Sequence, residues 1–144
     1  MRPFLFSCIA ALTIGVADEA AAAVCGPDRA SDLPYLETLK AAFLDADYPR
    51  FAELAGPYFP DLVEKVTDYF GQLMVVFPNS FRSCETILQR REAPGFHQEV
   101  VFYFPAGSSA PVALLLVAVE AEGEVRLVEF NFNTSISDVL GDIK

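Results

Sequence analysis

The sequence predicts an α+β domain in which N-terminal helices pack on a curved four-stranded antiparallel sheet, an α+β roll. Two observations support this prediction. Apolar residues recur at helical spacing in the first half of the chain and at a spacing of two in the second half. Four strand-like runs in the second half are separated by short breaks that contain Gly or Pro. The chain has 144 residues, which is enough for one hydrophobic core.

The first 23 residues have the layout of a secretory signal peptide. Arg2 supplies a positive start, residues 4–16 are almost wholly apolar, and the alanines at 20–23 offer small residues for cleavage. The apolar run is too short to span a bilayer as a helix. We therefore expect residues 1–23 to be removed and residues 24–144 to form a single domain that is secreted or periplasmic.

Two cysteines, Cys25 and Cys84, remain after this cleavage. In an exported domain they most simply form one disulfide. A redox-active pair would need a close C-x-x-C spacing, which they lack. Lipid attachment at Cys25 is disfavoured because Val24 precedes it, where lipoprotein processing uses a small residue.

Three helices are expected in the first half of the mature chain. Residues 31–32, Ser-Asp, can cap a helix that begins at Pro34. Asp47 gives a similar capping signal for a short second helix that ends at residues 56–57, Gly-Pro. A third helix is expected over residues 60–76, where one apolar stripe contains Leu62, Val66, Tyr69, Phe70 and Leu73.

The strands are expected at residues 84–91, 96–104, 112–121 and 124–133. Residues 122–123, Glu-Gly, can form a two-residue hairpin turn with Gly at a positive φ. This turn would pair Leu115 with Phe130, and the preceding hairpin would pair Val100 with Leu115. We therefore expect these three residues to be buried together against the helices.

The opposite face of the predicted sheet mixes polar and apolar side chains, which is typical of a pocket lining or a protein interface. The residues expected to form the ligand or partner face are Tyr103, Leu114, Leu116 and Asn131. The predicted partner is another protein or a small apolar ligand, and a homodimer through this face is an alternative.

Residues 41–54, Ala-Ala-Phe-Leu-Asp-Ala-Asp-Tyr-Pro-Arg-Phe-Ala-Glu-Leu, are similar to the opening of the nuclear transport factor two-like superfamily of α+β rolls. Residues 122–132 look like its final hairpin. The resemblance covers most of residues 33–133 and implies a small exported bacterial member whose sheet encloses a cavity. Members of that superfamily include isomerases, dehydratases, ligand binders and protein-interaction modules. A cystatin-like arrangement is the nearest alternative.

The candidate catalytic residues are His97, Glu99 and Glu129. His97 is the only histidine, and Glu99 lies two residues away on the same predicted face. In the predicted register, Glu99 and Glu129 flank Leu116 and lie roughly 9.6 Å apart, too far to share a proton. One histidine, two oxidised cysteines and scattered carboxylates predict no metal site and no cofactor.

The formal net charge of −10 disfavours binding to nucleic acid or to anionic membrane surfaces. We favour an exported domain without catalytic activity that binds a partner or ligand through the mixed sheet face. One alternative is an enzyme of the ketosteroid-isomerase or dehydratase type with His97 as acid and base. Another is an inhibitor or immunity-type protein, which an acidic surface would steer towards a basic target.

Overall fold

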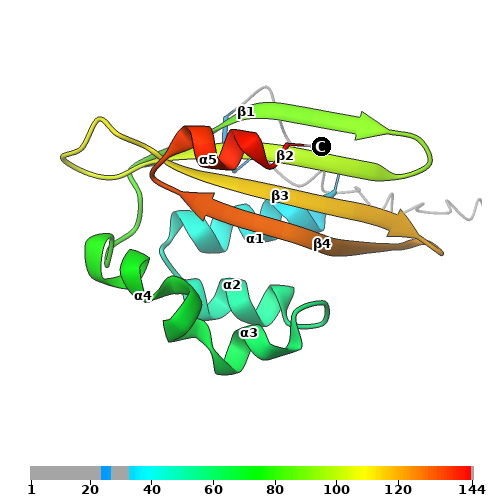
Figure 1. The fold of residues 1–144 in the computed structure, drawn as a ribbon, viewed down its shortest axis with the longest axis horizontal. Helices are drawn as coiled ribbons and strands as arrows, with labels where there is room; N and C mark the ends of the chain where they lie inside the picture. The colour runs from blue at the N-terminus through cyan, green and yellow to red at the C-terminus, as the bar shows by residue number, and fades with distance from the viewer. Residues whose placement is uncertain (1–23, 27–32, 144) are drawn as a thin grey trace, which may run out of the picture.

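The computed structural model describes residues 24–26 and 33–143 of the chain. Helices precede a four-stranded antiparallel sheet, and one short helix follows it (Figure 1). This arrangement confirms the predicted α+β class. The elements are α1 (Pro34–Leu44), α2 (Tyr48–Ala55), α3 (Pro60–Glu64), α4 (Val66–Val76), β1 (Ser83–Glu92), β2 (Phe96–Phe104), β3 (Val112–Ala121), β4 (Glu124–Asn133) and α5 (Ile136–Gly141).

Helices α1, α2 and α3 each have a proline at the first or second helical position. Leu33 is the N-cap of α1, and the predicted cap at residues 31–32 lies outside the described residues. The Asp47 side chain accepts a hydrogen bond of 3.0 Å from the backbone N–H of Arg50, which caps α2.

The single helix predicted over residues 60–76 is wrong, because Lys65 interrupts it and divides it into α3 and α4. Lys65 has φ −111° and ψ 26°, outside the helical region. Leu62 and Phe70 are buried on either side of this break, whereas Tyr69, also expected in the buried stripe, is 52% exposed.

The four strands lie in sequence order β1-β2-β3-β4 across the sheet. Glu122 and Gly123 join β3 to β4 with φ angles of 57° and 77°, which confirms the predicted turn and is typical of type I′. The predicted pairing of β2 with β3 is also confirmed, since Val100 pairs with Leu115.

The predicted pairing of β3 with β4 holds only near the turn. Ala118 pairs with Leu127, but Val117 pairs with Glu129, so a β-bulge at Val128 shifts the register by one residue. Because side chains alternate across a strand, this shift reverses the faces of the rest of β4. Phe130 therefore pairs with Leu116 and not with Leu115.

The bulge has a clear cause in the apolar pattern of β4. Strict alternation after Leu127 would turn Glu129 and Asn131 toward the helices and the Phe130 and Phe132 rings away from them. The bulge places both rings on the face of Leu127, where all three pack into the core beneath the helices. The extra burial of two aromatic rings favours the shifted register.

The sheet is covered on both faces. Helices α1–α4 lie along one face, and α5 packs on the other (Figure 1). The larger core lies between the sheet and α1–α4, and a smaller core joins Val139 of α5 to Val100 and Leu115. The prediction that Val100, Leu115 and Phe130 share one core is therefore wrong.

The predicted ligand face is likewise wrong. Tyr103, Leu114 and Leu116 have no exposed area and lie under the helices. The bulge places Asn131 on the opposite face, where its side-chain amide contacts the carboxylate of Asp142. The four residues thus form no common surface, because α1–α4 cover the face that was expected to be free.

Candidate functional site

The three candidate catalytic residues do not form a site. Glu99 pairs with Leu116 on the helix-covered face, whereas Glu129 pairs with Val117 on the face of α5. The sheet therefore separates the two carboxylates, and the prediction that they flank Leu116 is wrong. His97 is partly buried opposite Ala118 and lines none of the hollows described below.

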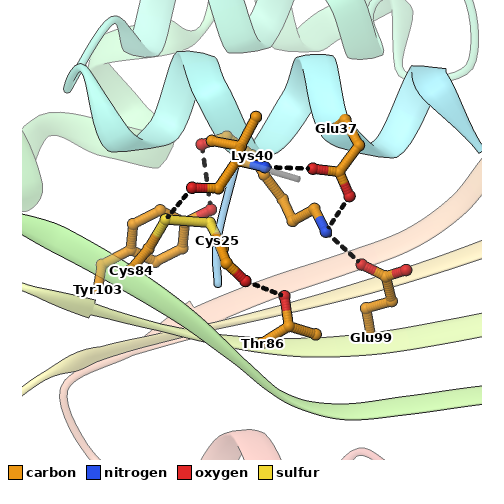
Figure 2. The surroundings of a disulfide bond; sticks show 8 residues. Cys25, Glu37, Lys40, Cys84, Thr86, Glu99 and Tyr103 are labelled. Atoms are coloured by element: carbon orange, nitrogen blue, oxygen red, sulfur yellow. Dashed lines mark hydrogen bonds and ion pairs between the residues drawn. A yellow bond between two sulfur atoms is a disulfide. The ribbon is translucent and has the colours of Figure 1, made fainter. Parts of the chain in front are cut away.

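Glu99 belongs instead to a buried ionic cluster with Lys40 and Glu37, which we name the Lys40 cluster (Figure 2). Lys40 has no exposed area, and its Nζ lies 2.9 Å from Glu99 Oε2 and also contacts the Glu37 carboxylate. Glu99 Oε1 accepts a hydrogen bond of 3.0 Å from the amide of Gln89. Glu37 and Glu99 are 3% and 2% exposed, so substrate has no access to them.

Tyr103 adds a neutral hydroxyl to this region. Its OH donates a hydrogen bond of 3.2 Å to the backbone carbonyl of Lys40. Burial, together with the carboxylates of Glu37 and Glu99, raises the pKa of Tyr103 well above its usual value. The phenol therefore stays protonated and serves to fix α1 on β2.

The apolar pattern of α1 contains a signal for this cluster, which the alternation used to place the sheet faces does not include. Lys40 lies four residues after Leu36 and three before Phe43, within the apolar stripe of α1. A lysine in such a stripe must pair with a carboxylate or leave the core. The pattern indicates a buried ion pair but not that its partners are Glu37 and Glu99.

The surface offers a more accessible site, a hollow of about 500 Å³ between the α3–α4 region and β4. Its lining is mostly aromatic. We name this hollow the aromatic groove, and its lining residues are Tyr58, Phe59, Pro60, Asp61, Leu62, Tyr69, Phe130, Asn131 and Phe132.

The inner wall of the aromatic groove is held by packed rings. Phe130 meets Phe59 edge to face at a centroid distance of 5.2 Å, and Phe132 stacks on Phe70 at 5.0 Å. Phe51 and Phe43 support the same two rings from behind. Such contacts stabilise ring positions beyond simple burial, so this wall is preformed.

Tyr58 fixes one end of the aromatic groove to β4. Its OH lies 2.9 Å from the carbonyl of Val125 and 3.2 Å from Glu124 Oε1. Burial and the Glu124 carboxylate raise the pKa of Tyr58. Asp61 is the one carboxylate in the lining, and its side chain also pairs with Lys65 at 3.4 Å.

A second hollow of about 300 Å³ lies beside Phe132, between the end of α4 and the end of β4. The same end of α4 carries exposed aliphatic side chains, of which Val75 is 81% and Val76 is 62% exposed. Phe132 lines both hollows, so the two adjoin at this ring.

Other kinds of site receive no support from the described residues. Within residues 24–26 and 33–143, no group of three His, Cys, Asp or Glu side chains is placed to hold a metal ion. No helix in the same ranges is both long and apolar enough to cross a membrane. Cys25 and Cys84 form a disulfide with an S–S distance of 2.09 Å, as predicted.

No family model, curated protein or solved structure with which the chain was compared matches it. The resemblance to the nuclear transport factor two-like superfamily therefore stays a prediction.

Proposed function

We propose that this chain is an exported binding domain without catalytic activity that takes a small, neutral, apolar ligand in the aromatic groove. The observation that carries this proposal is the groove itself. Its volume of about 500 Å³ falls within the range of about 300–1,000 Å³ typical of ligand pockets. Its rings offer flat apolar contact, and its wall is preformed by the packing of Phe130 and Phe132.

The charge of the groove favours a neutral ligand over an anionic one. The lining contains the carboxylate of Asp61 and no lysine, arginine or histidine. The whole chain carries a net charge of −10, so fatty acids and phosphorylated ligands would be repelled.

The absence of catalytic activity is part of the proposal and has its own support. The carboxylate of Glu99 is engaged by Lys40 and Gln89 beneath the helices. The groove lining holds no Ser, Cys, Lys or His that could act as a nucleophile or base beside Asp61.

Export is the third part of the proposal. The Cys25–Cys84 disulfide is compatible with an oxidising compartment. The signal-like pattern of residues 1–23 supplies the route.

Titration with the neutral dye Nile red tests the proposed site. We expect saturable one-to-one binding that Tyr69→Ala weakens about five- to tenfold, since one ring contact is worth roughly 1 kcal/mol. Tyr69 is 52% exposed, so this substitution spares the core. The matched control is Val75→Ala, on the same helix but outside the groove lining.

Three results would count against this function. These are non-saturable binding, equal affinity of the Tyr69→Ala variant and the parent, or tighter binding of an anionic naphthalene sulfonate than of the neutral dye. Either of the first two results would contradict ligand binding in the aromatic groove. The third would contradict the preference for a neutral ligand that we argued from Asp61.

A second candidate function is self-association through the end of α4 and the outer edge of β4. The exposed Val75 and Val76 support it, as does the position of β4 at the end of the described sheet. Sedimentation velocity should then show a dimer that Val75→Lys converts to a monomer. If the parent chain were monomeric at a concentration of about 100 μM, this candidate function would be excluded.

A further inference from the structure

The backbone nitrogen of Val24 lies at an unusual place for a residue next to an expected cleavage site. It donates a hydrogen bond of 2.9 Å to Glu37 Oε2. That carboxylate is buried and also contacts Lys40 in the Lys40 cluster. The residue at which the expected mature chain begins thus touches a buried ionic group.

We propose that hydrolysis of the Ala23–Val24 peptide bond creates an α-ammonium group on Val24 that joins the Lys40 cluster. Water adds across the bond, the carboxylate leaves with Ala23, and the nitrogen of Val24 gains the charge. This proposal depends on the export proposed above. It adds to the cleavage expected from the sequence a structural role for the new N-terminus.

Charge favours this arrangement. The Glu37 carboxylate that Val24 contacts is 3% exposed and also contacts Lys40 Nζ. A buried charge is costly unless it is paired. In the uncleaved chain Val24 offers Glu37 a neutral amide, whereas after cleavage it offers a cation at the same position. A charge-assisted hydrogen bond is roughly twice as strong as a neutral one.

The neighbouring residue already fixes this position. Cys25 is fully buried and disulfide-bonded to Cys84, and its carbonyl accepts hydrogen bonds of 3.3 Å from both the backbone N–H and the hydroxyl of Thr86 (Figure 2). The new terminus would therefore lose little conformational freedom when it pairs with Glu37. Most chain termini are not tied down in this way.

The structure also selects one cleavage site from several that the sequence allows. The alanines at positions 20–23 all offer small residues, and Ala21-Ala22-Ala23 is an A-x-A pattern. Cleavage one residue earlier would place the ammonium on Ala23 and leave an amide opposite Glu37. Only cleavage after Ala23 puts the charge on the atom that contacts the buried carboxylate.

The first test is to export the full chain from a bacterial host and to measure the intact mass and N-terminal sequence of the product. We expect Val24 at the N-terminus and a mass two hydrogens below that of the reduced chain. A product that begins at any other residue would overturn the proposal. An uncleaved product would overturn export as well, whereas the binding experiment with Nile red is independent of both.

The second test measures how much stability depends on placing the α-ammonium on Val24 and not on Ala23. Two chains are released from a tagged precursor by a site-specific protease, one beginning at Val24 and the other at Ala23. We expect the chain that begins at Val24 to melt about 3 °C or more above the other. In the Glu37→Gln background this difference should vanish. Equal melting temperatures in the parent background would overturn the proposal.

A third readout covers the case in which Glu37→Gln does not fold. The α-amine of the exported product is labelled with an amine reagent, in the folded state and in urea, and the labelling is quantified by peptide mass spectrometry. Pairing with Glu37 should slow labelling of Val24 at least tenfold in the folded protein relative to Lys65, which is half exposed. Equal protection factors for the two amines would overturn the pairing.

Discussion

Replacing Lys40 with methionine removes the ammonium of the Lys40 cluster and keeps most of the aliphatic side chain. Glu37 and Glu99 would then face each other's charge in a region that is at most 3% exposed. Breaking a buried ion pair from one side costs about 3–5 kcal/mol because it leaves an uncompensated charge. The change also removes the 2.9 Å contact to Glu99 Oε2.

Coulomb's law gives an independent estimate of the free energy lost in Lys40→Met, and its size is compatible with the range above. Two unit charges at 2.9 Å attract by about 6 kcal/mol at an effective dielectric constant near 20. Part of this attraction is offset by the hydration that both groups lost on burial. A net loss of about 3–5 kcal/mol is a large share of the roughly 5–15 kcal/mol by which domains are stable.

The assay is urea unfolding followed by circular dichroism, with the disulfide intact. The Lys40→Met midpoint should fall by about 1 M or more, given a slope of roughly 1–3 kcal/mol per M. Lys65→Met is the matched control, because Lys65 pairs with Asp61 at 3.4 Å on the surface, where the side chains are 50% and 73% exposed. The control should change stability by less than about 0.5 kcal/mol.

A rescue variant makes the physical reason testable. Adding Glu99→Gln to Lys40→Met removes the carboxylate that has lost its 2.9 Å contact with Lys40 Nζ, so it should restore part of the lost stability. The reasoning would be refuted if Lys40→Met were as stable as Lys65→Met, or if the rescue variant were less stable than Lys40→Met alone.

Three further predictions concern other parts of the fold. The side-chain amide of Gln98 is buried without a hydrogen-bond partner among the described residues. Gln98→Leu should therefore raise the free energy of unfolding, measured by urea unfolding, by about 1 kcal/mol. A lower free energy of unfolding would contradict this. Burial raises the pKa of Tyr35 and of Tyr48 to about 12. The stability contributed by these two protonated phenols is therefore complete below pH 10 and is lost as the pH rises through 12. Absorbance at 295 nm should accordingly show late ionisation of these two tyrosines and of the buried Tyr103, and ionisation of all tyrosines near pH 10 would be inconsistent with this packing. Cys25 and Cys84 are 59 residues apart, so replacing both with alanine should lower the free energy of unfolding by about 4 kcal/mol in the same urea assay. A change below about 1 kcal/mol would rule out a stabilising crosslink.

Local patterns predicted the four strands and helices α1 and α2, but neither the break at Lys65 nor the short helix α5. Strand boundaries and the turn at residues 122–123 follow from alternation and from a glycine that can adopt a positive φ. The cap at Asp47 follows from its position before a proline-started helix. These features depend on neighbours within a few residues, so the sequence contains their causes.

The candidate site could not be predicted in the same way. It depends on the bulge at Val128, which turns Phe130 and Phe132 toward the helices. The apolar spacing between Leu127 and Phe130 is compatible with a bulge, but strict alternation fits the rest of the strand. The choice between the two registers depends on which face the helices cover.

The sequence by itself determined the class of the fold, the positions of its strands and the pairing of Val100 with Leu115. Tertiary structure decided which face became the main core, because α5 covers Val100 and Leu115 while α1–α4 cover Tyr103 and its neighbours. The physical reason is that alternation divides a strand into two faces but does not say which helices will pack on each. That choice follows from the total apolar area that all the elements bury together.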